Sequence, residues 1–159
     1  MPAVLNVFKQ ENSFDACESV LQNLILSYQG DFAKHPLMSD VAKTGQVFNS
    51  LPSQLARDNK KFIYQLARTG ARAREYEDAI QWLIRSGLVY QVKLISKPVI
   101  PLAAYDDASA FKLYALDVGM MLKMAKLSPT AYTEGPRLFT EFKGGTNRKL
   151  YFTKFSCTI

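Results

Sequence analysis

The stretch of sequence that decides the fold reads ARAREYEDAIQWLIRSGLVYQVKLI and covers residues 71–95. In its first part, apolar side chains recur three and four residues apart, at Tyr76, Ala79, Ile80 and Leu83. This is the spacing of one face of an amphipathic helix. Gly87 can adopt the left-handed conformation that ends a helix. Residues 88–95 then alternate and are rich in β-branched and aromatic side chains. We therefore expect a helix over 71–86, with Trp82 on or beside its packed side, and a strand over 88–95.

Two longer helices are expected before this stretch. Residues 14–29 carry a one-sided apolar stripe that includes Cys17, which we expect to be a buried thiol. Ser13 is placed to cap the start of this helix, and Gly30 lies just past its end. Ser39 can cap a second helix, which Pro52 should end or kink, because proline lacks the amide hydrogen that a helix interior needs.

The remaining elements complete a recognisable order. Residues 62–64 could be a short strand or the entry to a helix, and residues 65–69 form a short helix that Gly70 breaks. A strand is expected to return over 111–116, and Asp117 can cap a last helix through Lys126. The order of helix, helix, tight turn, helix and two-stranded hairpin is that of a winged helix. The predicted fold class is mainly α with a small β-hairpin: a winged-helix-like domain flanked by helices, with 71–86 as recognition helix and 88–116 as wing.

Bulk composition restricts the class of protein. The chain has 159 residues, 48% of them hydrophobic, two cysteines and one histidine. These numbers are typical of a globular protein. The sequence has neither a long apolar run nor a signal peptide pattern, so we expect no membrane association and a cytoplasmic location. The net charge is +6, but Lys143, Arg148, Lys149 and Lys154 follow the last acidic residue, Glu141, so the preceding 141 residues carry only +2.

Catalytic and cofactor-binding patterns are not found in the sequence. A nucleotide-binding phosphate loop needs glycines that end in Gly-Lys-Ser/Thr, and residues 143–146 have that composition in the wrong order. His35 alone, with two distant cysteines, cannot supply the four ligands of a zinc site. The acidic cluster of Glu75, Glu77 and Asp78 lies near the start of a helix, where carboxylates stabilise the helix dipole. We expect no catalytic residue, no metal site and no cofactor in this chain.

Basic residues gather before and at the start of the expected recognition helix and on the wing. The candidate nucleic-acid contacts are Lys60, Lys61, Arg68, Arg72, Arg74, Lys93 and Lys97. Lysine and arginine neutralise phosphate, and the N-terminal end of a recognition helix reaches the major groove first. The carboxylates that follow at positions 75–78 would repel phosphate. The same residues could therefore be a solvated face or a face that docks on another protein.

The chain resembles a known family over residues 1–144. The matching pattern is Ala-Arg-Glu-Tyr-Glu-Asp-Ala-Ile-Gln-Trp-Leu at 73–83, then Gly-Leu-Val-Tyr at 87–90, Ser-Lys-Pro at 96–98, Phe-Lys-Leu-Tyr at 111–114 and Leu-Asp-Val-Gly at 116–119. The family consists of predicted AAA-class ATPases of bacteria and archaea. Their C-terminal half begins with a winged-helix-like segment and ends in a restriction-endonuclease-like domain.

The resemblance implies a division of the chain into four parts. Residues 1–35 would be a helical linker from the end of the ATPase part, and 36–116 the winged-helix-like domain. Residues 117–144 would be a helix and the start of a truncated endonuclease-like domain. Such proteins continue past residue 144 as Ala-Leu-Thr-Glu-Asn-Tyr-Ile-Leu-Gln, whereas this chain reads GTNRKLYFTK. With suitable synonymous codons, insertion of one base after the codon for Gly144 converts the family's coding sequence into the one that encodes this chain's residues 145–153. Residues 145–159 would then be a frameshifted, non-native tail.

Two functions remain open at this point. In the first, the chain is a non-catalytic winged-helix-like module of a larger AAA-class ATPase that contacts DNA. In the second, it is an architectural or protein-interaction module between the ATPase and endonuclease-like domains. In both cases the partner is the ATPase domain of the parent protein, and ATP and magnesium are implied for that domain only.

Overall fold

The computed structural model describes residues 2–34, 38–57, 61–97 and 99–127. The helices are α1 (Pro2–Glu11), α2 (Phe14–Asp31), α3 (Met38–Ala56), α4 (Tyr64–Ala67), α5 (Ala73–Arg85) and α6 (Val118–Met124). A short 3₁₀ turn, Phe32–Lys34, follows α2, and a second, Leu102–Tyr105, precedes β2 in the hairpin. The strands β1 (Val89–Ile95) and β2 (Asp106–Ala115) form one antiparallel hairpin. The fold is mainly α with a small hairpin and is winged-helix-like, as the sequence predicts.

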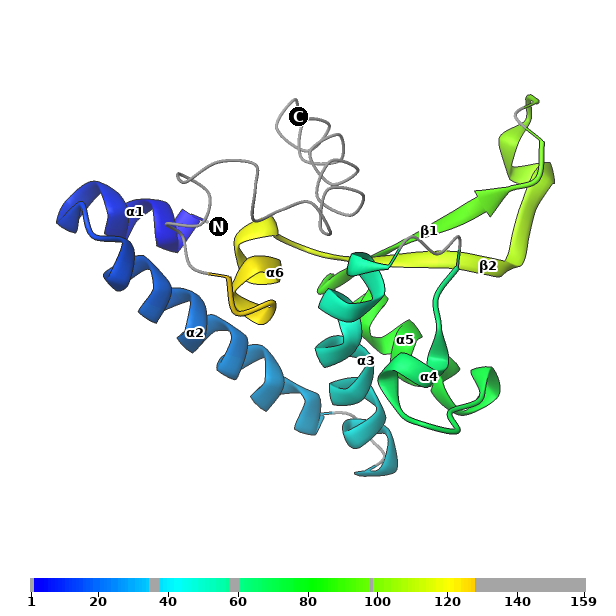
Figure 1. Ribbon diagram of the computed structural model, residues 1–159, viewed down its shortest axis with the longest axis horizontal. Coiled ribbons are helices and arrows are strands. Elements are labelled where there is room, and N and C mark those ends of the chain that lie inside the picture. Colours follow the sequence, from blue (N-terminus) through cyan, green and yellow to red (C-terminus); the bar gives the residue numbers. More distant parts are fainter. Residues whose placement is uncertain (1, 35–37, 58–60, 98, 128–159) are drawn as a thin grey trace.

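The hydrophobic core lies where α3, α5 and the inner half of the hairpin meet (Figure 1). Phe48 and Leu51 of α3 and Leu83 of α5 have no exposed surface. Burial of one such side chain contributes about 1.5–3 kcal/mol. The buried residues Tyr76, Ile80 and Leu88 confirm the predicted core face. Trp82 is half-buried beside this face, and its ring meets Phe32 edge-on at 5.6 Å between centroids.

The loop before α4 is fastened to the body by backbone and side-chain hydrogen bonds. The amide of Phe62 donates to the carbonyl of Phe111 on β2 at 2.6 Å, and the two rings stack at 5.8 Å between centroids. The buried side chain of Gln54 donates to the carbonyl of Ile63 at 2.7 Å and accepts from its amide at 3.0 Å. One glutamine thus satisfies both backbone groups of a residue outside regular structure, which fixes where the helix-turn-helix begins.

Three helices flank the winged helix on the side opposite the hairpin (Figure 1). Helix α1 lies against α2 and buries none of its own residues. Helix α2 reaches the core through Cys17 and Ile25, which are both buried. Helix α6 buries Met120 and Met121. An ion pair between Glu18 of α2 and Lys123 of α6 joins segments that are 105 residues apart in the chain.

Most of the predicted helix ends are confirmed. The Ser13 side chain accepts from the Ala16 amide at 3.3 Å, and Asp117 accepts from the Met120 amide at 3.0 Å. Gly87 follows α5 with a positive φ of 72°, and Gly70 turns between α4 and α5 with a φ of 79°. Both values lie in the left-handed region, where glycine is favoured.

Several boundaries differ from prediction. Ser39 does not cap its helix, because α3 begins at Met38 and Ser39 lies inside it. Gly30 is inside α2 rather than past its end, because the Phe32 amide donates to the carbonyls of Gln29 and Gly30 and carries the helix into a 3₁₀ turn. Pro52 does not end α3, which runs on to Ala56. The buried side chains on both sides of it hold the turn against the roughly 3 kcal/mol that an internal proline costs. The returning strand starts at Asp106 rather than 111, so β2 is longer than predicted, within the expected hairpin of 88–116.

Candidate functional site

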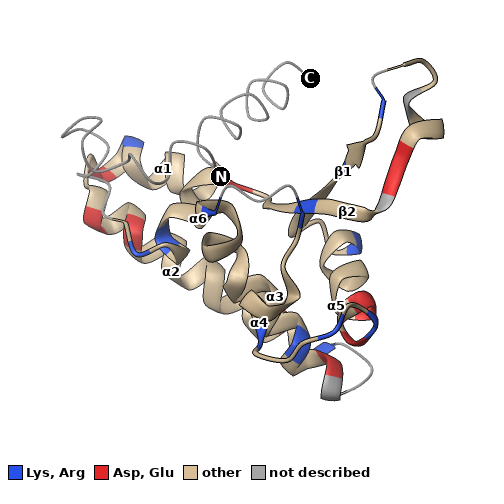
Figure 2. Cartoon of the chain, turned by 45° about the vertical axis from the view of Figure 1, so that its right-hand side comes forward, with Lys and Arg blue, Asp and Glu red and all other residues tan. Residues whose placement is uncertain are grey.

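The described basic candidates are all exposed, but they form two groups (Figure 2). Arg68, Arg72 and Arg74 lie between α4 and the first turn of α5, whereas Lys93 and Lys97 lie on and just after β1. Lys61 precedes α4 beside β2, where its charge acts on Asp107. Lys60 lies outside the described residues. Arg72 is the residue before α5, and its side chain forms no capping hydrogen bond there. The exposed arginines agree with a surface that meets solvent or a partner.

Acidic side chains interrupt the first group. Glu75, Glu77 and Asp78 are exposed in the first half of α5. With two arginines and three carboxylates, α5 has a net charge of −1. The negative charge of α5 also acts on the neighbouring helix α4. Burial, and to a lesser extent the charge of Glu77, raise the pKa of Tyr64 above its usual value. The face that a winged helix would turn toward phosphate therefore carries mixed charge rather than a continuous positive patch.

The lysines of the wing are also offset by carboxylates. Lys93 donates to Asp106 at 3.1 Å across the hairpin, in a partly exposed pair of the kind that contributes little to stability. Beside it, hydrogen bonds from the side chain and backbone of Ser109 lower the pKa of Asp107. The wing thus presents Asp106 and Asp107 as well as its lysines Lys93, Lys97 and Lys112.

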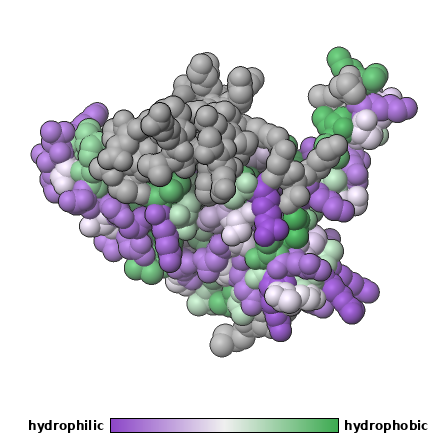
Figure 3. All heavy atoms as spheres, viewed as in Figure 1, coloured by the Kyte–Doolittle hydropathy of each residue, from purple (hydrophilic) through white to green (hydrophobic). Residues whose placement is uncertain are grey.

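The outer part of the hairpin instead exposes apolar side chains (Figure 3). We call them the apolar wing surface: Val92, Leu94, Ile95, Val99 and Ile100. Ile100 is 89% exposed and Val99 50% exposed. Neither packs on the helical body, from which the hairpin projects. Sequence reasoning missed this surface. The sequence did contain an indication of this surface. Residues 92–95 place apolar side chains on both faces of the strand, and a hairpin that packs through one face leaves those on the other face exposed.

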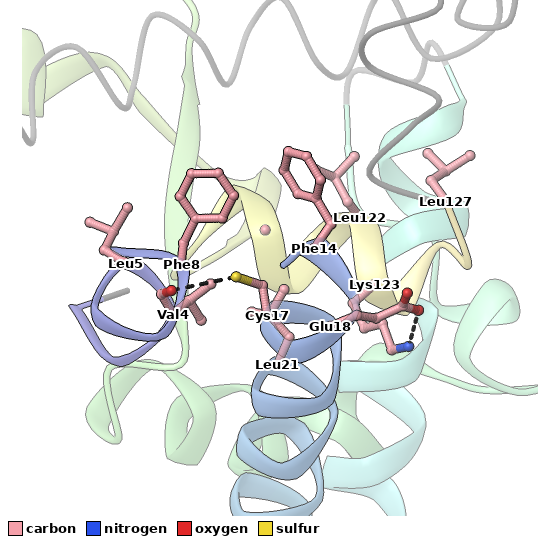
Figure 4. A pocket seen from close by; sticks show the side chains of 11 residues that line it. Val4, Leu5, Phe8, Phe14, Cys17, Glu18, Leu21, Leu122, Lys123 and Leu127 are labelled. Carbon is pink, nitrogen blue, oxygen red and sulfur yellow. Dashed lines mark hydrogen bonds and ion pairs between the residues drawn. The ribbon is translucent and has the colours of Figure 1, made fainter. Parts of the chain in front are cut away.

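A second apolar surface lies at the other end of the molecule (Figure 4). Helices α1, α2 and α6 enclose a groove of about 410 Å³, which we call the N-terminal groove. Its apolar lining consists of Val4, Leu5, Phe8, Phe14, Cys17, Leu21, Leu122 and Leu127. Glu18 and Lys123 are its charged side chains, and they pair with each other. The sequence did not indicate this groove, because α1 was not predicted as a separate helix.

The described ranges offer neither a metal site nor a membrane span. No group of three or more histidine, cysteine, aspartate or glutamate side chains there could hold a metal ion. None of the helices of this part is long and apolar enough to cross a bilayer. His35, Cys157 and residues 143–146, which the sequence analysis considered for metal or phosphate binding, lie outside it.

Comparison with known proteins places most of the chain in one family. Residues 1–131 match the model of a family described as Domain of unknown function (DUF8612). No curated protein and no solved structure matches the chain. The matched region includes the winged helix, the wing and all three helices around the N-terminal groove.

Proposed function

The chain belongs to this family, and we propose that it is a non-catalytic, winged-helix-like docking module of a larger AAA-class ATPase, which contacts another protein domain through its wing. The observation that supports docking through the wing is the apolar wing surface, where Ile100 is 89% exposed. The parent ATPase is supported by the resemblance of residues 1–144 alone.

Exposure of these side chains is costly unless something covers them. Val92, Leu94 and Ile95 are 37–43% exposed, and Val99 and Ile100 follow them in the outer part of the hairpin. Apolar surface buried on association contributes about 25 cal/mol per Å² before the costs of association. A wing that binds along the DNA backbone needs basic side chains that can pair with phosphate. In this wing, Lys93 is already paired with Asp106. Its chemistry fits a protein surface better.

DNA contact is the second candidate, and the exposed arginines Arg68, Arg72 and Arg74 favour it. They precede or open α5 in the position from which a recognition helix reaches bases and phosphates. The carboxylates of α5 oppose it. If DNA binds, binding should be weak and should fall steeply with salt.

The genomic sequence upstream of Met1 is the first test. We expect it to encode an ATPase domain with a phosphate-binding loop, and its absence would overturn the link to a parent ATPase. The upstream domain, produced separately, should then bind the chain in surface plasmon resonance. Ile100→Asp should weaken binding at least 10-fold, which corresponds to about 1.4 kcal/mol. Leu26→Asp is the matched control, because Leu26 is 54% exposed on α2, far from the wing.

Fluorescence anisotropy with a labelled DNA duplex separates the two candidates. For a docking module we expect no saturable binding at 150 mM salt. The DNA role would be favoured if the double variant Arg72→Ala with Arg74→Ala bound the duplex more weakly. Its salt slope should then be lower by about one unit for each phosphate that it no longer neutralises. If Ile100→Asp leaves the affinity for the ATPase domain unchanged, the wing is not the docking element.

A further inference from the structure

The N-terminal groove is open and almost wholly apolar in its side chains (Figure 4). Leu5 of α1 and Phe14 of α2 line it and are 60% and 52% exposed. Phe8 reaches Phe14 across the groove with 5.1 Å between ring centroids. Large apolar side chains on two helices thus face a volume of about 410 Å³ that none of them fills.

The polar groups of the groove are already used. Glu18 and Lys123 pair with each other, and the thiol of Cys17 donates to the carbonyl of Val4 at 3.6 Å. Sites for polar small molecules reserve a few polar groups that orient the ligand. The lining of this groove therefore favours apolar side chains of a polypeptide, in the manner of a helix laid into a hydrophobic groove.

The chain itself carries such a segment close by. Leu127 is part of the groove lining and is the last described residue, so residue 128 begins at the groove. Leu138, Phe139 and Phe142 follow, spaced three and four residues apart as in a one-faced anchor. Eleven residues from Leu127 span at most about 36 Å when extended. Helix α1, with 10 residues, is about 15 Å long, so the segment can reach the whole groove.

We infer that the N-terminal groove is the docking site for the chain's own segment 138–142, with Leu138, Phe139 and Phe142 as its apolar anchors. A tethered segment meets its site at an effective concentration in the millimolar range. A modest contact is therefore sufficient to keep it bound. The docked segment covers Leu5 and Phe14 and holds α1, which buries no residue of its own, against α2.

A double-mutant cycle in the full chain tests this inference. Phe14→Asp and Phe139→Asp are made singly and together, and Tm is measured. We expect Phe14→Asp to lower Tm by about 3 °C more in the wild-type chain than in the Phe139→Asp chain. Leu26→Asp is the matched control, because Leu26 is equally exposed on the same helix but outside the groove. Its effect should be the same in both backgrounds. Equal effects of Phe14→Asp in both backgrounds would overturn the inference.

Cross-linking identifies the occupant. Leu5→Cys and Phe139→Cys are combined in a chain with Cys17→Ala and Cys157→Ser, so that neither native thiol can form the cross-link, and the protein is oxidised and run on a non-reducing gel. A cross-linked monomer, absent when Leu26→Cys replaces Leu5→Cys, is expected for docking within one chain. A cross-linked dimer would show that a second copy fills the groove, and no cross-link would leave the segment elsewhere; either result contradicts the inference. Leu5→Cys alters an exposed position, so folding should be retained.

Discussion

Truncation of Leu83 is the sharpest test of the core of the winged helix. Leu83 lies on α5, has no exposed surface and belongs to the same cluster as Phe48 and Leu51 of α3. Leu83→Ala removes the equivalent of three methylene groups, and each contributes about 0.8 kcal/mol. The transfer term is therefore about 2.4 kcal/mol, and the cavity left behind brings the expected loss to about 2–5 kcal/mol.

Urea unfolding followed by circular dichroism measures this loss. The midpoint should fall with an unchanged m-value, since the surface exposed on unfolding hardly changes. For a chain of this size, each kcal/mol corresponds to about 3 °C, so Tm should fall by about 6–15 °C. Leu26→Ala on the exposed side of α2 should change stability by less than about 0.5 kcal/mol. A loss below about 1 kcal/mol for Leu83→Ala would refute the assignment of α5 as the central helix of the core.

Four further outcomes are expected. Gly87→Ala should lower the free energy of unfolding by about 1–2 kcal/mol, because φ is 72° there. Gly45→Ala inside α3 should raise it by about 0.4–1 kcal/mol, because an added Cβ meets nothing within 4 Å. Urea midpoints that move in the same direction for both variants would contradict this pair of predictions. Gln54→Leu leaves the Ile63 amide without its partner and its carbonyl with the Leu66 amide as donor, and it should cost about 1–3 kcal/mol in the same assay, while an unchanged midpoint would show that water replaces the glutamine side chain. Isothermal titration calorimetry should detect no micromolar binding of ATP to the isolated chain, and measurable heat would reveal a phosphate site that the sequence does not indicate. Deletion of residues 145–159 should lower Tm by less than about 10 °C, and a larger fall would show that this tail is integral to the fold.

The helices and strands of the winged helix could be predicted from the sequence because each has a strong local signal. The apolar spacing on α5, the cap at Ser13 and the glycine at position 87 each depend on neighbouring residues only. Of the two outcomes expected for Pro52, an ending of the helix does not occur, because packing of the buried side chains around it holds α3 together. The prediction for Gly30 was wrong because a 3₁₀ turn follows α2 and extends it past this residue.

The surfaces were less predictable than the fold. The basic candidates in the described ranges are exposed, but how they are divided over the surface depends on how far the hairpin projects, which no local pattern encodes. The N-terminal groove requires α1, α2 and α6 to meet, and α6 is more than a hundred residues from α1 in the chain. Long-range packing of this kind has no signature in a single sequence.

The hairpin also has a consequence for handling the protein. Among the described strands, β1 pairs with β2 along one edge only. Its other edge, with Val92, Leu94 and Ile95 exposed, could template further strands from other molecules. Lys93 lies in the middle of this segment, and a charged edge residue opposes stacking of identical chains at 4.7–4.8 Å. Asp106 offsets part of the charge of Lys93, so this protection is incomplete, and concentrated preparations should be kept at low salt, where charge repulsion is screened least.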